Sequence, residues 1–153
     1  MHQRVAVSDL AHAAYCPRQL HYARREETRE PPPRVREIRS LAFAYPTLVS
    51  AADTALAARP IACAPAEYRR NLRRLRERDV WDGLTAPAGR DVRLSGKDCR
   101  GGAHKLVGDP PVPSLVSPGK PPERGVWEPH RVRAVGLAKA LSWEREAPVE
   151  RAL

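Results

Sequence analysis

Apolar residues recur with helical spacing over the first half of the chain. Residues 8–29 read as two helical pieces that break at Cys16–Pro17, because proline disfavours a helical residue before it. Between Val35 and Arg59 the apolar residues again follow helical intervals, with a break near Tyr45–Pro46. These spacings predict a succession of short helices that precede the first strand.

The clearest helical pattern runs from residue 66 to residue 78. Tyr68, Leu72 and Leu75 fall on one face of this predicted helix. Much of the remaining surface carries arginine, at Arg69, Arg70, Arg73, Arg74 and Arg76. Such a charge run is typical of a solvated amphipathic helix or of a helix that faces phosphates, and the pattern leaves both open.

The second half of the chain changes to strand-like spacing and then returns to a helix. Strand-like runs occupy residues 91–94, 103–107 and 112–116, and residues 149–153 begin another. Between them a helix is expected from Glu128 to about Glu144. Helices followed by strands and a further helix predict an α/β fold of the restriction-endonuclease type, with a short mixed sheet flanked by helices.

Charge is the strongest compositional signal. The 153 residues contain 27 Lys+Arg and 18 Asp+Glu, which gives a formal net charge of +9. Such an excess attracts phosphate and raises affinity for nucleic acid. Nearly all of the cations are arginine, which suits bidentate phosphate contacts better than lysine does. Composition therefore favours nucleic acid as a partner.

Cysteine usage and hydropathy indicate the cellular compartment. Cys16, Cys63 and Cys99 are widely and irregularly spaced, with no C-x-x-C pair, which argues against a zinc ribbon or a disulfide framework. No apolar run approaches membrane-spanning length, and the N-terminus lacks the apolar region of a signal peptide. We therefore expect a cytoplasmic protein with reduced thiols and no membrane partner.

Two stretches carry a family resemblance. The first reads S-D-L and then A-Y-C-P-R-Q-L-H-Y within Val7–Tyr22, with Ser8 as a helix cap and Pro17 as a first helical residue. The second, Gly119–Val132, reads G-K-P-P-E-R-G-V-W-E-P-H-R-V. Together they resemble the CRISPR-associated RecB-like exonucleases (the "Cas-four" family) of the PD-(D/E)XK nuclease superfamily.

The resemblance implies a metal-dependent DNA exonuclease that processes DNA ends during spacer acquisition. In that family acidic residues on adjacent strands hold Mg²⁺ or Mn²⁺, and a lysine steadies the developing charge. Placed on this chain, the metal-binding aspartate is replaced by His104, the acid of the next strand by Leu115 and its lysine by Ser117. The glutamine and tyrosine positions on the following helix fall on Arg133 and Leu137.

These replacements remove the catalytic chemistry of the family. Leucine cannot bind a hard cation, and serine carries no charge. His104 and Asp109 form a weak candidate pair for a transition metal, because Asp109 lies in a Gly-Asp-Pro-Pro stretch typical of a turn. We therefore expect a degenerate member that retains binding to DNA or to a protein partner rather than cleavage.

The resemblance also implies a [4Fe-4S] cluster in complete relatives, held by one cysteine near the N-terminus and three near the C-terminus. Cys16 matches the first position, whereas Cys63 and Cys99 match none. We therefore expect the chain to be part of a longer protein or a truncated relative, with residues 149–153 as an interrupted strand.

Three segments of the chain are expected to have different roles. Residues 1–30 form an N-terminal helical segment with the cluster-type cysteine, residues 31–90 a helical region with the basic helix, and residues 91–153 a partial nuclease-like core. Trp127 is expected as a core anchor rather than a platform for a base. The residues expected to contact DNA are Arg18, Arg69, Arg70, Arg73, Arg74 and Lys120.

Two other functions stay open. The protein could be a catalytically silent adaptor that binds other Cas proteins through apolar helix faces, and salt-insensitive association with a protein would favour this function. It could also be a basic fragment without function, for which broad, uncooperative unfolding would be the sign.

Overall fold

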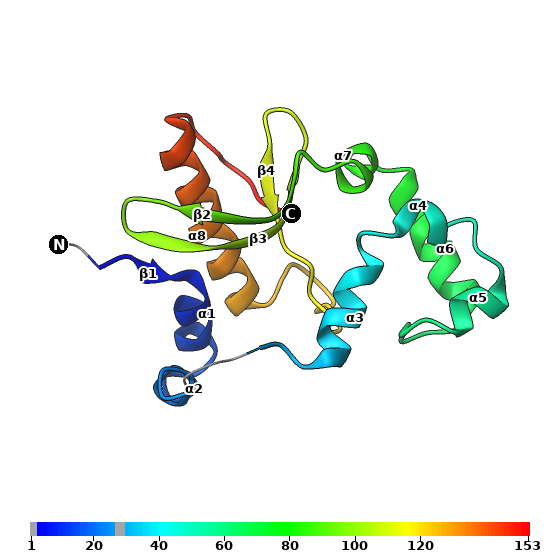
Figure 1. Cartoon of the computed structure of the whole chain (residues 1–153), viewed down its shortest axis with the longest axis horizontal. Coiled ribbons are helices and arrows are strands. Elements are labelled where there is room, and N and C mark those ends of the chain that lie inside the picture. Colours follow the sequence, from blue (N-terminus) through cyan, green and yellow to red (C-terminus); the bar gives the residue numbers. More distant parts are fainter. Residues whose placement is uncertain (1–2, 27–29) are drawn as a thin grey trace.

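The chain has an α/β fold in which a small mixed sheet of four strands is flanked by helices, as predicted (Figure 1). A computed structural model describes residues 3–26 and 30–153. In chain order its elements are β1 (Val5–Ala6), α1 (Val7–Tyr15), α2 (Pro17–Ala23), α3 (Pro33–Leu41), α4 (Tyr45–Leu48), α5 (Asp53–Ala57), α6 (Pro65–Arg76), α7 (Trp81–Thr85), β2 (Gly89–Ser95), β3 (Cys99–Val107), β4 (Val112–Ser114) and α8 (Glu128–Arg145).

The central strand of the sheet is β3. It pairs antiparallel with β2, and on its other side it pairs parallel with β1 at Cys99 and antiparallel with β4 at Val107. After α8 the chain returns to β4, where the Leu153 amide donates to the Pro113 carbonyl (2.9 Å) and the Leu115 amide donates to the Leu153 carbonyl (2.6 Å). This bonding is that of parallel neighbours, so the predicted strand at residues 149–153 is reduced to one pairing residue.

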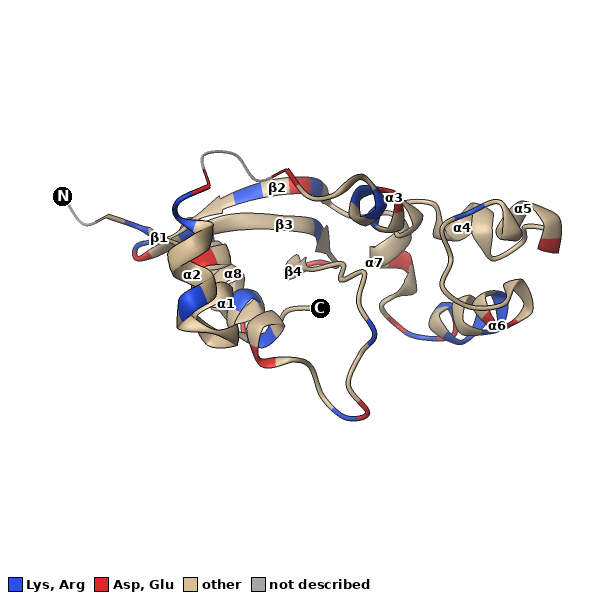
Figure 2. Cartoon of the chain, turned by 90° about the horizontal axis from the view of Figure 1, so that it is seen from below, with Lys and Arg blue, Asp and Glu red and all other residues tan. Residues whose placement is uncertain are grey.

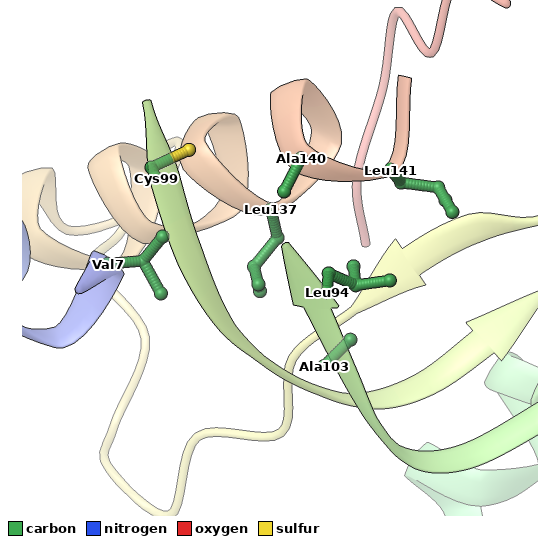
Figure 3. Close-up of a cluster of buried hydrophobic side chains, with 7 residues drawn as sticks. All are labelled: Val7, Leu94, Cys99, Ala103, Leu137, Ala140 and Leu141. Atoms are coloured by element: carbon green, nitrogen blue, oxygen red, sulfur yellow. The ribbon is translucent and has the colours of Figure 1, made fainter. Parts of the chain in front are cut away.

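The sheet packs against α1 and α8 through one hydrophobic cluster, named here the sheet cluster. Its buried members are Val7, Leu94, Cys99, Ala103, Leu137, Ala140 and Leu141 (Figure 3). A Cβ on Gly101 would lie 2.2 Å from Cγ2 of Val7, and one on Gly136 would lie 2.8 Å from its Cγ1. The two glycines therefore allow α1 to approach both β3 and α8 closely.

A second hydrophobic cluster, the helical cluster, lies at the end of the molecule opposite α1 and α2 (Figure 1). Its buried members are Leu41, Leu48, Val49, Leu56 and Leu72. Tyr45 and Trp81 stack on each other beside it, with ring centroids 6.3 Å apart. The cluster thus joins α3, α4, α5 and α6 into a small helical unit of local contacts.

The helix expected at residues 66–78 is α6, and Tyr68 and Leu72 pack inward as predicted. In contrast, β3 begins at Cys99, four residues before the expected strand, and neither β1 nor α7 was expected. Val7, at the start of α1, is a member of the sheet cluster and so packs with residues of β2, β3 and α8. Within the described ranges, no helix combines the length and the apolar character needed to cross a membrane.

Candidate functional site

A cavity of about 670 Å³ opens beside the first turns of α8. Its walls are the loop of residues 115–122, the start of α8 and residues 149–153, and Arg39 of α3 also lines it. The titratable and charged residues in the lining are Arg39, Lys120, His130, Arg131, Arg133, Lys139, Glu150 and Arg151. The cavity is therefore strongly basic.

Two of these arginines, both half-buried, each have one buried nitrogen without a hydrogen bond among the described residues. The Nε atoms of Arg39 and Arg133 are both buried and make no hydrogen bond. Among the described residues, neither guanidinium has a carboxylate within ion-pair distance. Burial, followed by the charge of Arg39, lowers the pKa of Arg133. A buried donor without an acceptor costs free energy, so an anion that accepts from these half-buried side chains would be stabilised.

Behind the cavity, His104 holds the start of the loop in place. The side chain is 9% exposed, and its Nδ1 accepts a hydrogen bond from the Val116 amide at 2.7 Å. Burial and the nearby positive charges of Arg39 and Arg133 lower the pKa of His104 to about 4. His104 is therefore neutral at pH 7 and serves as a fixed hydrogen-bond acceptor.

Four of the five positions that the family resemblance assigns to catalysis come together around the cavity. Leu115, Ser117 and Arg133 line it, and His104 is bonded to the residue between the first two. Leu137 does not join them, because it is fully buried in the sheet cluster. None of the four side chains is a carboxylate, so they do not fit a site for Mg²⁺ or Mn²⁺.

The proposed metal pair of His104 and Asp109 does not fit a metal ion either. Asp109 is exposed in the turn between β3 and β4, and Nδ1 of His104 is already engaged by a backbone amide. Over residues 3–26 and 30–153, no three His, Cys, Asp or Glu side chains are grouped to hold a metal.

The three thiols lie on different elements and are free. Cys16 forms the corner between α1 and α2, whereas Cys63 precedes α6. Cys99 is buried in the sheet cluster, where its Sγ donates to the Gly136 carbonyl at 3.2 Å and burial raises the pKa of its thiol. These residues do not fit a four-thiolate cluster.

The basic side chains of α6 divide into two kinds. Arg69 donates to the Ala51 carbonyl at 2.7 Å and pairs with Asp53, which ties α6 to α5. The structure therefore gives Arg69 a structural role where the sequence suggested a phosphate contact. Arg70, Arg73 and Arg74 are exposed, and Figure 2 shows the basic residues along α6. Arg18 and Lys120, the remaining predicted contacts, are also exposed, on α2 and in the cavity loop.

Trp127 was expected in the core, and this prediction is wrong. The side chain is 52% exposed and lines the cavity. Its Nε1 donates to the Lys120 carbonyl at 2.9 Å, so the ring is held by the loop before α8 and not by the core. Prolines at positions 121 and 122 stiffen that loop, and they were the sequence signal for a structured loop.

Sequence reasoning did not single out Lys105, which is 1% exposed in the middle of the molecule. Its Nζ donates to the carbonyls of Leu84, at 2.7 Å, and of Ala42. The ammonium also lies 4.9 Å from the ring centroids of both Phe43 and Tyr45. Burial lowers the pKa of Lys105 to about 8. This side chain links β3 to the helical unit.

The arrangement presents basic side chains to an anion, and its acid–base groups are His130 and Glu150 rather than the paired carboxylates that hold the metal of a nuclease. The cavity brings together two unpaired guanidinium groups, apolar walls and an exposed indole ring. His104 is neutral and bonded to the backbone, so it serves as a structural acceptor. In comparisons with known proteins, no family model, no curated protein and no solved structure matches this chain.

Proposed function

We propose that this protein binds DNA without cleaving it, as a degenerate relative of the CRISPR-associated RecB-like exonucleases. The cavity beside α8 carries the proposal. Positions that the resemblance assigns to catalysis surround it, yet they contribute a guanidinium where a nuclease needs carboxylates. Guanidinium groups bind phosphate directly, so contact with a nucleic-acid backbone needs no metal ion.

The order of the elements supports a nuclease-like origin. After the two-residue strand β1 the described chain forms seven helices, then three strands joined in antiparallel pairs, and α8 carries the chain back to a parallel contact with β4. This is the order expected for a restriction-endonuclease type of layout. The likeness concerns the scaffold, whereas the activity depends on the side chains that the scaffold presents.

A second group of cations supports contact with more than one phosphate. Arg70, Arg73 and Arg74 project from α6 into solvent, and the described chain gives them no carboxylate within ion-pair distance. Exposed arginines without partners can neutralise backbone phosphates, and each such contact adds to the salt dependence of binding.

The test is the salt dependence of binding to labelled single-stranded DNA, measured by fluorescence anisotropy in EDTA. Replacing Arg70, Arg73 and Arg74 together by glutamine should weaken binding and flatten the slope of log K against log salt by about 0.7 per lost contact. Replacement of the same three residues by lysine is the matched control, because lysine keeps the charge and both residues suit a helix. We expect the lysine variant to keep most of the slope.

One result would contradict the contact with α6, and another would contradict the function. Identical slopes for the glutamine and lysine variants would remove α6 from the interface. Absence of any DNA binding by the unaltered protein at low salt would contradict DNA binding itself.

An adaptor that binds other Cas proteins is the second candidate, favoured by apolar exposure on α8. Val135 and Trp143 are 54% and 55% exposed on that helix, and Val126 just before it is 62% exposed. Association with a protein through these residues would be insensitive to salt, because apolar burial does not depend on screened charges.

A further inference from the structure

The lining of the cavity is chemically mixed. It includes the apolar residues Leu115, Pro118 and Trp127 as well as the basic residues Arg39 and Arg133. A volume of about 670 Å³ lies within the range of sites that hold small molecules. A ligand that uses both kinds of residue combines an apolar part with an anionic group.

The two guanidinium groups are close enough to influence the same neighbours. Both contribute to the lowered pKa of His104, and Arg39 contributes to that of Arg133. Each retains a buried Nε–H without an acceptor. The lining carboxylate, Glu150, is exposed and forms no ion pair with either arginine. A phosphate between the two would accept from both and relieve their mutual repulsion.

The indole ring of Trp127 is fixed in position and partly exposed, so a planar group could stack on it. Its N–H is committed to the Lys120 carbonyl, which fixes the ring at the cavity, and about half of the side chain is exposed. Exposed aromatic rings bind nucleobases by stacking, with little dependence on sequence. Among the described residues, no other aromatic ring stacks on Trp127.

We infer that the cavity binds a nucleotide with a terminal phosphate, with the phosphate on Arg39 and Arg133 and the base against Trp127. The inference rests on the proposed function and assigns this cavity to the end of a DNA strand, with α6 as a separate contact for the backbone. The site requires no metal ion, because the guanidinium groups supply the charge.

The test is titration of the full chain with thymidine 5′-monophosphate in EDTA, followed by calorimetry and by tryptophan fluorescence. We expect the monophosphate to bind at least tenfold more tightly than thymidine. Arg133→Gln and Arg39→Gln should each weaken binding of the monophosphate at least tenfold. Arg93→Gln, which removes the same charge from an exposed position on β2 outside the cavity lining, should leave the affinity unchanged.

Three outcomes would overturn the inference. Equal affinity for thymidine and its monophosphate would exclude the phosphate contact. Equal affinity for inorganic phosphate and the monophosphate, with no effect of Trp127→Leu, would exclude the base contact. An Arg133→Gln variant that melts like the unaltered protein and binds the monophosphate as Arg93→Gln does would exclude the proposed arginine pair.

The experiments distinguish a wrong assignment of the cavity from a wrong proposal of DNA binding. If single-stranded DNA binds but the monophosphate does not, and Arg39→Gln and Arg133→Gln bind DNA as Arg93→Gln does, the cavity is not the site and DNA binding stands. If the unaltered protein binds neither DNA nor the monophosphate, both proposals are wrong.

Discussion

The two hydrophobic clusters differ in how far apart their residues lie along the chain. The helical cluster uses residues from Leu41 to Leu72, whereas the sheet cluster joins Val7 to Leu141. Contacts within the first form between neighbouring helices, but the second requires both ends of the chain to meet. The candidate site belongs to the second kind, because its walls come from α3, the loop after β4, α8 and the chain that follows it.

Two long basic side chains cross between the two regions in opposite directions. Lys105 extends from β3 to the carbonyls of Ala42 and Leu84, and Arg39 extends from α3 into the cavity beside α8. The Lys105 ammonium has two carbonyl acceptors, whereas the buried Nε of Arg39 has no acceptor among residues 3–26 and 30–153. We therefore expect Lys105 to stabilise the fold and Arg39 to be available for a ligand.

The largest loss of stability is expected from Lys105→Met, which removes the link between the two regions. The buried Ala42 carbonyl and the half-buried Leu84 carbonyl would lose their donor. Leaving a buried carbonyl unsatisfied costs about 1–3 kcal/mol. We expect the free energy of unfolding to fall by about 3 kcal/mol, measured by urea denaturation. Lys97→Met, at an exposed lysine, should change it by less than about 0.5 kcal/mol. Equal stability of the two variants would show that Lys105 does not link the regions.

Gly101→Ala should disturb the sheet cluster selectively. The added Cβ would collide with Val7, which is 2% exposed and has little room to move, and overpacking of this kind costs about 1–3 kcal/mol. Gly102→Ala is the matched control, because nothing lies within 4 Å of a Cβ at that position. Thermal unfolding should separate the two variants, and identical melting would refute the close approach of α1 to β3.

Arg69→Gln should weaken the helical unit, since it removes the ion pair with Asp53 and the hydrogen bond to the Ala51 carbonyl. The expected loss is about 1 kcal/mol in the free energy of unfolding, because Asp53 is largely exposed. The exposed neighbour Arg73→Gln should lose less than half of that. A larger loss in Arg73→Gln would contradict the division of the α6 arginines.

The last comparison concerns the pH dependence of stability and the His104 side chain. The pKa of His104 is lowered to about 4 by burial and by Arg39 and Arg133, against about 6.5 in an unfolded chain. Between these values the unfolded state binds more protons, so stability falls as the pH drops from about 6.5 to about 4. His104→Asn retains an acceptor that does not titrate, and denaturation at several pH values should show a smaller fall. An equal fall in both proteins would exclude His104 as a source of acid sensitivity.

Elements with strong periodicity could be predicted from the sequence, and those that depend on tertiary contacts could not. The apolar face identified α6, and the helix from Glu128 matches α8. The start of β3 was missed because Gly101 and Gly102 are poor strand formers, and only the approach of Val7 explains the first of them. The strand β1, with two residues, is too short to leave a periodic signal.

The sequence did not predict the cavity, although it drew attention to some of the residues that line it. Leu115, Ser117 and Arg133 were singled out by the family resemblance, and the structure places all three in the lining of one cavity. Arg39 was not singled out, because its helix reads as an ordinary charged surface and its approach to the cavity is a tertiary contact. The burial of Lys105 was missed for the same reason, since its acceptors are backbone carbonyls that have no sequence signature.

The central claim is binding to DNA without cleavage, and one incubation tests it most directly. End-labelled single-stranded DNA is mixed with the protein in Mg²⁺, in Mn²⁺ and in EDTA, and each sample is divided between a native gel for binding and a denaturing gel for length. We predict a bound fraction in all three conditions, smaller where a divalent cation competes for the phosphates, and DNA of unchanged length. Metal-dependent shortening of the DNA, or no bound fraction in any condition, would contradict the claim.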